Sequence, residues 1–151
     1  MSVLARIDLD LKAAMKNSDS LRLSVLRMAK SALKYRQIEK GDGFSEDDVA
    51  SVLATLVKQR RESVEQYEKG GRQELADKER QEIAIIQEYL PAQLSAEELD
   101  SLIRSSISES GAKGEADLGK VMKILAPRTK GLADGKLVNA RVRELLSAAS
   151  N

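Results

Sequence analysis

The chain of 151 residues contains no cysteine and no histidine. The lack of cysteine excludes disulfide bonds, thiolate metal ligands and a thiol nucleophile. The lack of histidine removes the side chain that most often serves as a general base near neutral pH. There is also no tryptophan and only one phenylalanine, so aliphatic side chains must form the core. No apolar run approaches the roughly 20 residues that a membrane-spanning helix needs.

Motifs for common cofactors are absent as well, since neither a GxxxxGK[ST] phosphate loop nor a GxGxxG fingerprint occurs. Gly41-Asp42-Gly43 lies between two expected helices and is interpreted as a turn. The acidic run Glu46-Asp47-Asp48 could attract a cation, but negative charge is also favourable at a helix N-terminus. We therefore expect no catalytic residue, no metal and no cofactor, and a soluble cytoplasmic protein. A stand-alone enzyme would need a buried polar constellation that the sequence does not reveal.

Helical periodicity runs through almost the whole chain, and it predicts an all-α protein. Helices are expected over about 3–16, 20–39, 46–69 and 72–90, then from Ser95 to Gly111, from Asp117 to Pro127, and from Asp134 onward. Gly70-Gly71 joins the third and fourth helices as a long antiparallel hairpin. We expect an N-terminal helical domain over 1–92 and a small three-helix domain over 93–151.

Two capping boxes predict where helices begin. Ser45 and Asp48 form an acidic variant of the box, and Ser95 and Glu98 match it fully. Within the helices, apolar stripes predict the core. In the N-terminal domain the first helix carries Leu4, Ile7, Leu11 and Met15 on one stripe. The second helix carries apolar residues over a wide arc, which are Leu21, Val25, Leu26, Met28, Ala32 and Leu33. The core of the C-terminal domain is expected to contain Val121, Met122, Leu125, Val138 and Val142.

The positive charge is concentrated near the C-terminus, although the net charge is only +1. The stretch Lys120–Glu144 holds seven basic residues against Asp134 and Glu144. Lys136 is expected in the first turn of a helix, where a cation is locally unfavourable, so stability alone does not explain it. Outward-facing cations of this kind suit contacts to nucleic-acid phosphates. The predicted nucleic-acid-binding residues are Lys123, Lys130 and Lys136, with Lys120 and Arg128 in support and Gly131 permitting close approach.

A second charged stretch, Val57–Glu82, falls on the predicted hairpin. Its alternating charges are typical of a salt-bridged solvent face. The other interpretation is that Lys58, Arg60 and Arg61 contact a partner, which would make the 46–90 hairpin the docking arm of a protein–protein adaptor.

The basic stretch resembles part of a known protein family. The segment "GKVMKILAPRTKGLADGKLVN" resembles the tail domain shared by the YqeY family and the B subunit of the tRNA-dependent amidotransferases. The pattern is matched by Gly119, Val121, Met122, Lys123, Lys130, Gly131, Ala133, Asp134, Val138 and Asn139. Upstream, "LSVLRMAKSALKYRQIEKG", "VKQRRESVEQYEKGGRQELADKE" and "YLPAQLS" resemble YqeY specifically.

The resemblance implies a GatB/YqeY-like protein whose tail contacts tRNA. In the amidotransferase the tail helps grip the tRNA body, and similar modules occur on some glutaminyl-tRNA synthetases. The implied partners are therefore tRNA and an amidotransferase or aminoacyl-tRNA synthetase. The segments that carry catalysis in the carbon–nitrogen ligase, which uses glutamine as amido donor, have no counterpart here. The expected function is a non-catalytic tRNA-binding module or accessory factor; the hairpin adaptor is the alternative.

Overall fold

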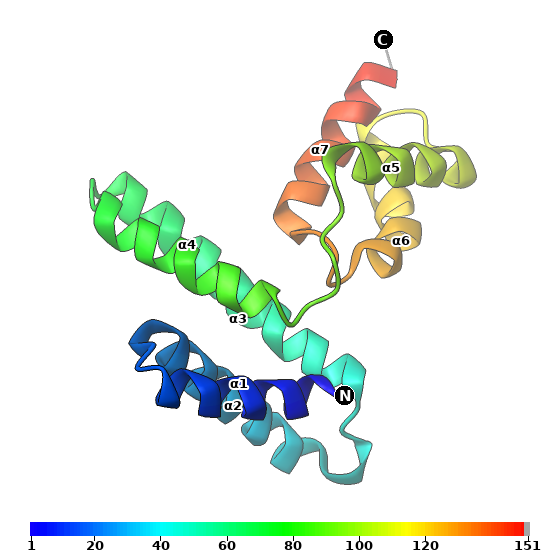
Figure 1. Cartoon of the computed structure of the whole chain (residues 1–151). Coiled ribbons are helices and arrows are strands. Elements are labelled where there is room, and N and C mark those ends of the chain that lie inside the picture. Colours follow the sequence, from blue (N-terminus) through cyan, green and yellow to red (C-terminus); the bar gives the residue numbers. More distant parts are fainter. Residues whose placement is uncertain (150–151) are drawn as a thin grey trace. The chain divides into compact units, whose positions relative to one another are not determined.

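The computed structural model describes residues 1–149, and these contain helices and no β-strand (Figure 1). The helices are α1 (Val3–Lys16), α2 (Ser20–Lys40), α3 (Glu46–Lys69), α4 (Gln73–Gln87), α5 (Ala96–Ser110), α6 (Leu118–Thr129) and α7 (Gly135–Ala149). Two short 3-10 turns, η1 (Gly41–Gly43) and η2 (Glu115–Asp117), precede α3 and α6. The predicted all-α class is confirmed. The chain forms two compact units that divide after Pro91.

Side-chain caps explain why the helices begin where they do. The Ser2 hydroxyl accepts from Ala5 N–H at 3.1 Å, and the Asp19 carboxylate accepts from Arg22 N–H at 3.1 Å. The capping box at α3 is complete, because Ser45 N–H also donates to the Asp48 carboxylate. At α5 the structure shows the Ser95 half of the predicted box, in which its hydroxyl accepts from Glu98 N–H. Each bond satisfies a donor that the first helical turn leaves without a partner.

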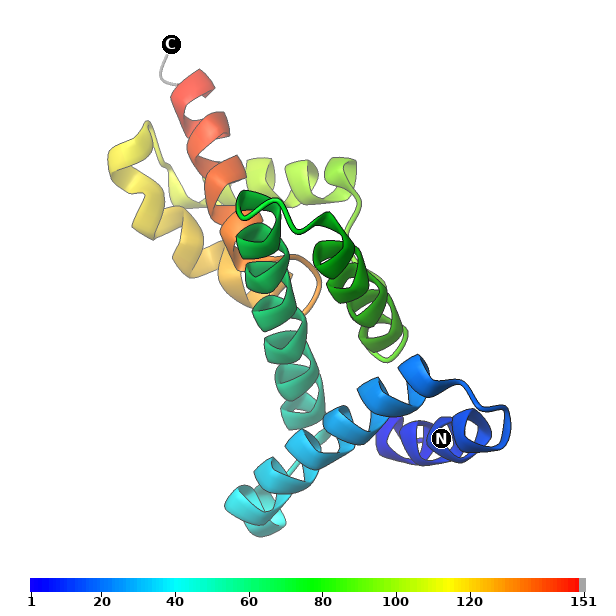
Figure 2. The ribbon, with the colours of Figure 1, turned by 90° about the vertical axis from the view of Figure 1, so that its left-hand side faces the viewer.

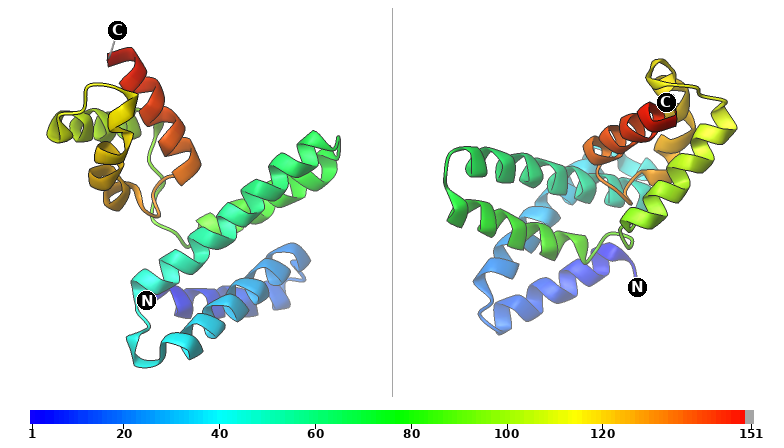
Figure 3. Two further views of the ribbon diagram at one scale, coloured as in Figure 1. Left: turned by 180° about the vertical axis from the view of Figure 1, so that it is seen from behind. Right: turned by 90° about the horizontal axis from the view of Figure 1, so that it is seen from above.

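The N-terminal unit is built around the α3–α4 hairpin, against which α1 and α2 pack (Figure 1, Figure 3). The hairpin turns at Gly70-Gly71, where Gly71 has φ +71°, a left-handed conformation that glycine adopts without strain. Buried side chains from all four helices form one core: Ile7, Val25, Leu26, Ala29, Leu33, Val49, Val52, Leu53, Leu56, Val57, Ile85, Ile86 and Tyr89.

Two residues that were predicted to face this core do not. Met15 is 53% exposed, and the neighbouring Ala14 is buried in its place. Met28 is 37% exposed, because the buried arc of α2 runs instead through Val25, Ala29 and Leu33. The other predicted residues of these stripes do face the core: Ile7, Val25, Leu26 and Leu33 are buried, and Leu4, Leu11, Leu21 and Ala32 pack against them.

A polar network closes the N-terminal unit where α4 ends. α4 stops at Gln87, earlier than the predicted Leu90, and Glu88 and Tyr89 turn back to α1 and α2. Arg22 forms a two-point ion pair with the Glu88 carboxylate, and Arg6 donates to the Glu88 carbonyl at 3.2 Å. Tyr89 donates to the Asp10 carboxylate. Burial and this acceptor raise the pKa of Tyr89, so the phenol stays a donor at physiological pH.

The C-terminal unit is a three-helix arrangement of α5, α6 and α7 with a core of its own (Figure 2). Its buried residues are Leu99, Ile103, Val121, Leu125, Val138, Val142 and Leu146. The predicted core residues Val121, Leu125, Val138 and Val142 are confirmed, and Met122 packs against this cluster from the edge.

The predicted end of α6 at Pro127 is wrong, because the helix continues to Thr129 with Pro127 inside it. Proline has no N–H to donate to the Lys123 carbonyl. The last turn nevertheless holds, since Lys130 N–H donates to the Ala126 carbonyl at 3.0 Å and Thr129 is buried. Tertiary burial of Leu125 and Thr129 thus outweighs the local preference of proline.

Candidate nucleic-acid interface

The predicted basic residues lie on α6, at its C-terminal end and at the start of α7. Lys120 and Lys123 are on α6, and Lys130 is its C-terminal cap residue. At 3.6 residues per turn these three lysines fall within an arc of about 80° on the helix. All three are exposed. The buried residues of α6, Val121, Leu125 and Thr129, lie on its opposite side.

Two of these lysines have no acidic partner. Among residues 1–149 the structure gives no ion pair to Lys123 or Lys130. Lys120 is 3.5 Å from the Asp117 carboxylate, with its side chain 69% exposed. Such a surface pair contributes little and is easily exchanged for another anion. The face of α6 formed by Lys120, Lys123 and Lys130, here called the lysine face, therefore presents positive charge to solvent.

Arg128 differs from its prediction. It was expected in the turn, but it lies within the last turn of α6. Its guanidinium donates to the Glu109 carboxylate at 2.7 Å and to the Ser106 hydroxyl at 3.4 Å. Both acceptors belong to α5, so Arg128 ties α5 to α6 and is directed away from the lysine face. Its charge is largely compensated within the unit.

Gly131 forms the turn between α6 and α7, with φ +76°. No atom lies within 4 Å of the position that a Cβ would occupy, so glycine is needed there for its backbone conformation. The turn is fixed to the preceding segment, since the Gln93 amide donates to the Gly131 carbonyl at 3.1 Å and Leu94 N–H to the Leu132 carbonyl at 2.8 Å. Close approach of a ligand to Gly131 stays a prediction.

Lys136 is the second residue of α7 and is exposed. The first turn of α7 contains no acidic residue, and the carbonyl of Asp134 accepts from Val138 N–H at 2.9 Å. A cation at the positive end of a helix dipole is unfavourable for folding. The predicted location of Lys136 in the first turn of a helix is confirmed, and its contact with nucleic acid stays a prediction.

Arg141, another cation of the basic stretch, serves the fold. It forms a two-point pair with Asp100 of α5 at 2.8 Å for both contacts, and it also contacts Glu144 at 2.7 Å. The sequence did not reveal this pair or the Arg128–Glu109 pair, because each joins residues of different helices. The basic stretch consequently offers fewer available charges than a count from the sequence suggests.

The Asp100–Arg141 pair predicts a pH dependence. Hydrogen bonding to Arg141 holds the pKa of Asp100 below its usual value. A depressed carboxyl pKa stabilises the fold above the unfolded-state value of about 4, and this stabilisation is lost as pH falls through the folded-state pKa. Asp100→Asn should therefore lower the urea midpoint of the C-terminal unit at pH 7, with the difference from wild type shrinking below about pH 4. In an Arg141→Met background the same substitution should show no such pH-dependent difference; if it does, another partner controls Asp100.

Elsewhere in the chain the acidic run at 46–48 serves as a helix cap. The Asp48 carboxylate accepts from Ser45 N–H and lies 3.3 Å from the Lys40 ammonium. The Ser45 hydrogen bond is the main cause of its lowered pKa. Within residues 1–149 no cluster of acidic side chains has the arrangement of a metal site. The described helices also include none that is long and apolar enough to cross a membrane.

The hairpin shows mainly internal pairing. Arg80 pairs with Glu68 across the hairpin and with Asp77 along α4. Arg60, which was considered as a partner contact, is only 8% exposed and lies between α3, α2 and α4, so that interpretation is wrong for Arg60. The predicted salt-bridged solvent face is confirmed for Arg72 and Arg80, which pair with Glu74, Glu68 and Asp77.

These features define a two-unit, all-helical protein with a lysine face on its C-terminal unit. The model of the family described as "Yqey-like protein" matches residues 4–146, and the chain belongs to this family. Curated relatives carry the name "Altered inheritance of mitochondria protein 41, mitochondrial". The relative from Eremothecium gossypii is 33% identical over 150 residues, which are 97% of this chain and 81% of the relative.

Shorter matches connect the chain with further fungal relatives of the same name. The relative from Vanderwaltozyma polyspora is 33% identical over 103 residues, 66% of this chain and 56% of the relative. That from Kluyveromyces lactis is 35% identical over 104 residues, with the same shares. The matched region spans little more than half the length of these two relatives. Their names place them in mitochondria, and a cytoplasmic location of this chain stays a prediction.

Proposed function

We propose that this YqeY-family protein is a non-catalytic tRNA-binding module that contacts the RNA backbone through the lysine face of α6. The observation that carries the proposal is the position of Lys123 and Lys130, which share one exposed face and have no acidic partner among the described residues. Lys120 extends this face, and Lys136 adds a positive charge at the start of α7, whereas Arg128 contributes less because it is paired with Glu109. Phosphate contacts of this kind position a protein on nucleic acid without reading bases.

Two further considerations support tRNA as the ligand. The same residues carry the resemblance to the amidotransferase tail, which in that enzyme helps grip the tRNA body. The C-terminal unit also contains no aromatic residue. The unit therefore lacks the aromatic side chains on which single-stranded bases usually stack, and this favours contacts to the backbone of a folded RNA. Docking through the 46–90 hairpin stays a prediction, with no contact in the hairpin that favours it.

The test is fluorescence anisotropy with labelled bulk tRNA over a series of salt concentrations. The Lys123→Glu, Lys130→Glu variant should bind at least about tenfold more weakly than wild type. The slope of log K against log salt should also become shallower by roughly one to two, because two phosphate contacts are lost. Unstructured poly(U) should compete poorly.

A matched control variant separates the effect of charge on the lysine face from the effect of the net charge of the protein. Lys12→Glu, Lys16→Glu on α1 changes the net charge equally at two exposed positions. It should leave tRNA affinity within about twofold of wild type. Equal losses in both variants, or no binding by wild type at low salt, would overturn the proposal.

A further inference from the structure

One face of α2 has no partner in the N-terminal unit. α2 contacts α1, α3 and α4, which bury Val25, Leu26, Ala29 and Leu33. The remaining side bears three large exposed apolar residues: Met28 at 37%, Tyr35 at 74% and Ile38 at 75% exposure. On the helix these fall within an arc of about 80°. The outer face of α2 is defined here as Ser20, Ser24, Met28, Ser31, Tyr35 and Ile38.

This apolar arrangement is particular to α2. Among the described residues, the other large exposed apolar residues are Met1 at the N-terminus, Leu9 and Met15 on α1, and Leu137 on α7. Leu9 and Met15 lie about 120° apart on their helix, so they share no stripe. Scattered residues of this kind are normal on protein surfaces, whereas a stripe at positions i, i+7 and i+10 matches the anchors of a helix-binding surface.

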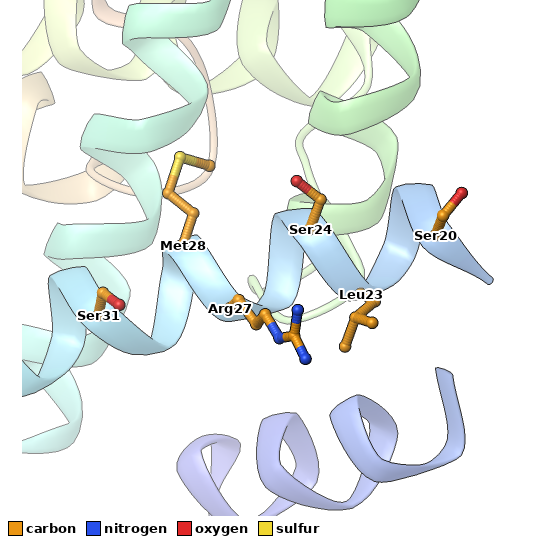
Figure 4. A pocket seen from close by; sticks show the side chains of 6 residues that line it. All are labelled: Ser20, Leu23, Ser24, Arg27, Met28 and Ser31. Atoms are coloured by element: carbon orange, nitrogen blue, oxygen red, sulfur yellow. The ribbon is translucent and has the colours of Figure 1, made fainter. Parts of the chain in front are cut away.

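The shape of the outer face suits an elongated ligand. The N-terminal half of α2 is a shallow, open surface lined by Ser20, Leu23, Ser24, Arg27, Met28 and Ser31 (Figure 4). All the lining residues belong to α2, so no opposing wall encloses a small molecule there. Serine side chains are short and allow another backbone to approach closely. From Ser24 to Ile38 the face extends over about 21 Å, or four helical turns.

The two edges of the face differ in character. Figure 4 shows Met28 and Arg27 projecting to opposite sides of α2. On the Met28 edge, the Arg60 guanidinium contacts the Met28 sulfur at 2.9 Å and fixes its position. On the other edge, Arg27 and Lys34 are exposed and have no ion pair with any residue of the range 1–149.

The unpaired state of these two cations contrasts with the rest of α2. Its other basic residues have acidic partners: Arg22 with Glu88, Lys30 with Asp8 at 2.7 Å, Arg36 with Glu39 at 3.4 Å and Lys40 with Asp48 at 3.3 Å. Only the edge beside the apolar stripe therefore offers positive charge that the fold does not use.

We propose that the outer face of α2 docks an amphipathic helix of a partner protein, whose apolar stripe is flanked by acidic residues. The partner's apolar side chains would cover Met28, Tyr35 and Ile38. Its carboxylates would meet Arg27 and Lys34, which are seven residues apart and thus on one edge of the interface. This proposal is independent of tRNA binding by the C-terminal unit.

The charges also disfavour the other occupants of such a face. In an antiparallel pair of two copies, Arg27 and Lys34 of one chain would oppose the same residues of the other. Glu39, the nearest carboxylate on α2, is already paired with Arg36. Two unpaired cations beside a stripe of Met, Tyr and Ile are too few to bind a nucleic-acid backbone, because affinity for the backbone depends on many phosphate contacts.

The test uses two labelled model peptides of about three heptads. Both carry Leu and Ile along the stripe; one has Glu at the flanking positions and its twin has Lys. In anisotropy titrations with the full chain, the acidic peptide should bind at least about tenfold more tightly than the basic twin. Ile38→Asp should weaken binding of the acidic peptide at least about tenfold, and Arg27→Glu, Lys34→Glu should reverse the preference towards the basic twin.

Because the replaced side chains are exposed, the variants should fold, which circular dichroism checks. Lys12→Glu, Lys16→Glu is the matched charge control and should bind the acidic peptide as wild type does. Binding of neither peptide, equal binding of both, or binding insensitive to Ile38→Asp would overturn the proposal. It would equally be overturned if sedimentation showed a dimer that Ile38→Asp dissociates, or if that substitution abolished tRNA binding.

Discussion

Leu125→Ala should unfold the C-terminal unit while the N-terminal unit stays folded. Leu125 is fully buried among the seven residues of the C-terminal core. Truncating a buried leucine to alanine costs about 2–5 kcal/mol. A unit of about 60 residues has a total stability of only roughly 3–9 kcal/mol, so one such cavity removes much or all of it. Hydrogen exchange should show loss of protection in α5, α6 and α7 and retained protection in α2 and α3.

The same chemical change at an exposed site provides the control. Leu137 of α7 is 60% exposed, and Leu137→Ala should alter stability by less than about 0.5 kcal/mol. Calorimetry should then show the transition of the C-terminal unit lowered by Leu125→Ala alone. If the N-terminal helices lost protection to the same degree, the two cores would form one cooperative unit, contrary to their separation in the structure.

The sequence predicts the helices well because their ends are encoded locally. Ser45 and Asp48 satisfy each other's backbone donors within four residues, and Gly71 supplies the left-handed conformation of the hairpin turn. These signals do not depend on the rest of the fold. The prediction fails at Pro127. Proline locally favours the end of a helix, but α6 continues to Thr129 because the flanking residues Leu125 and Thr129 are buried.

Which charges remain available could not be predicted in the same way. Arg128 and Arg141 look equivalent to Lys123 and Lys130 in the sequence, but they pair with Glu109 and Asp100 of another helix. Such pairs depend on how α5 packs against α6 and α7, which no local pattern encodes. The sequence therefore identifies the basic stretch, and the structure is needed to select the lysine face from it.

Arg60→Ala is expected to destabilise the N-terminal unit by about 3 kcal/mol. Arg60 is 8% exposed and donates to the Leu56 carbonyl at 3.0 Å and to the Met28 sulfur at 2.9 Å. Its Nε is buried without a hydrogen-bond partner and lies 3.9 Å from the Glu82 carboxylate. Truncation would leave the Glu82 charge, whose side chain is 16% exposed, without its cation and would open a cavity.

The loss of Arg60 should also change the pKa of the nearby Glu79 carboxyl group. Burial is the main cause of the raised pKa of Glu79, and repulsion from Glu82 adds to it, while Arg60 acts in the opposite direction. Loss of Arg60 should thus raise the pKa of Glu79 further, which NMR titration of its carboxyl group can measure. Arg61→Ala, one residue along α3, serves as the control for urea unfolding followed by circular dichroism, with an expected change below about 0.5 kcal/mol.

A double replacement separates the net contribution of the Arg60–Glu82 ion pair to stability from the destabilisation caused by removing one of its partners. Replacing a buried ion pair with apolar residues of similar size is often neutral, whereas removing one partner is strongly destabilising. Arg60→Met with Glu82→Met should therefore recover most of the stability that either single replacement loses, with a coupling energy of about 1–3 kcal/mol. Additive losses would instead mean that Arg60 stabilises the unit through its contacts with Leu56 of α3 and Met28 of α2. In that case the guanidinium holds α2 against α3 whether or not Glu82 is charged.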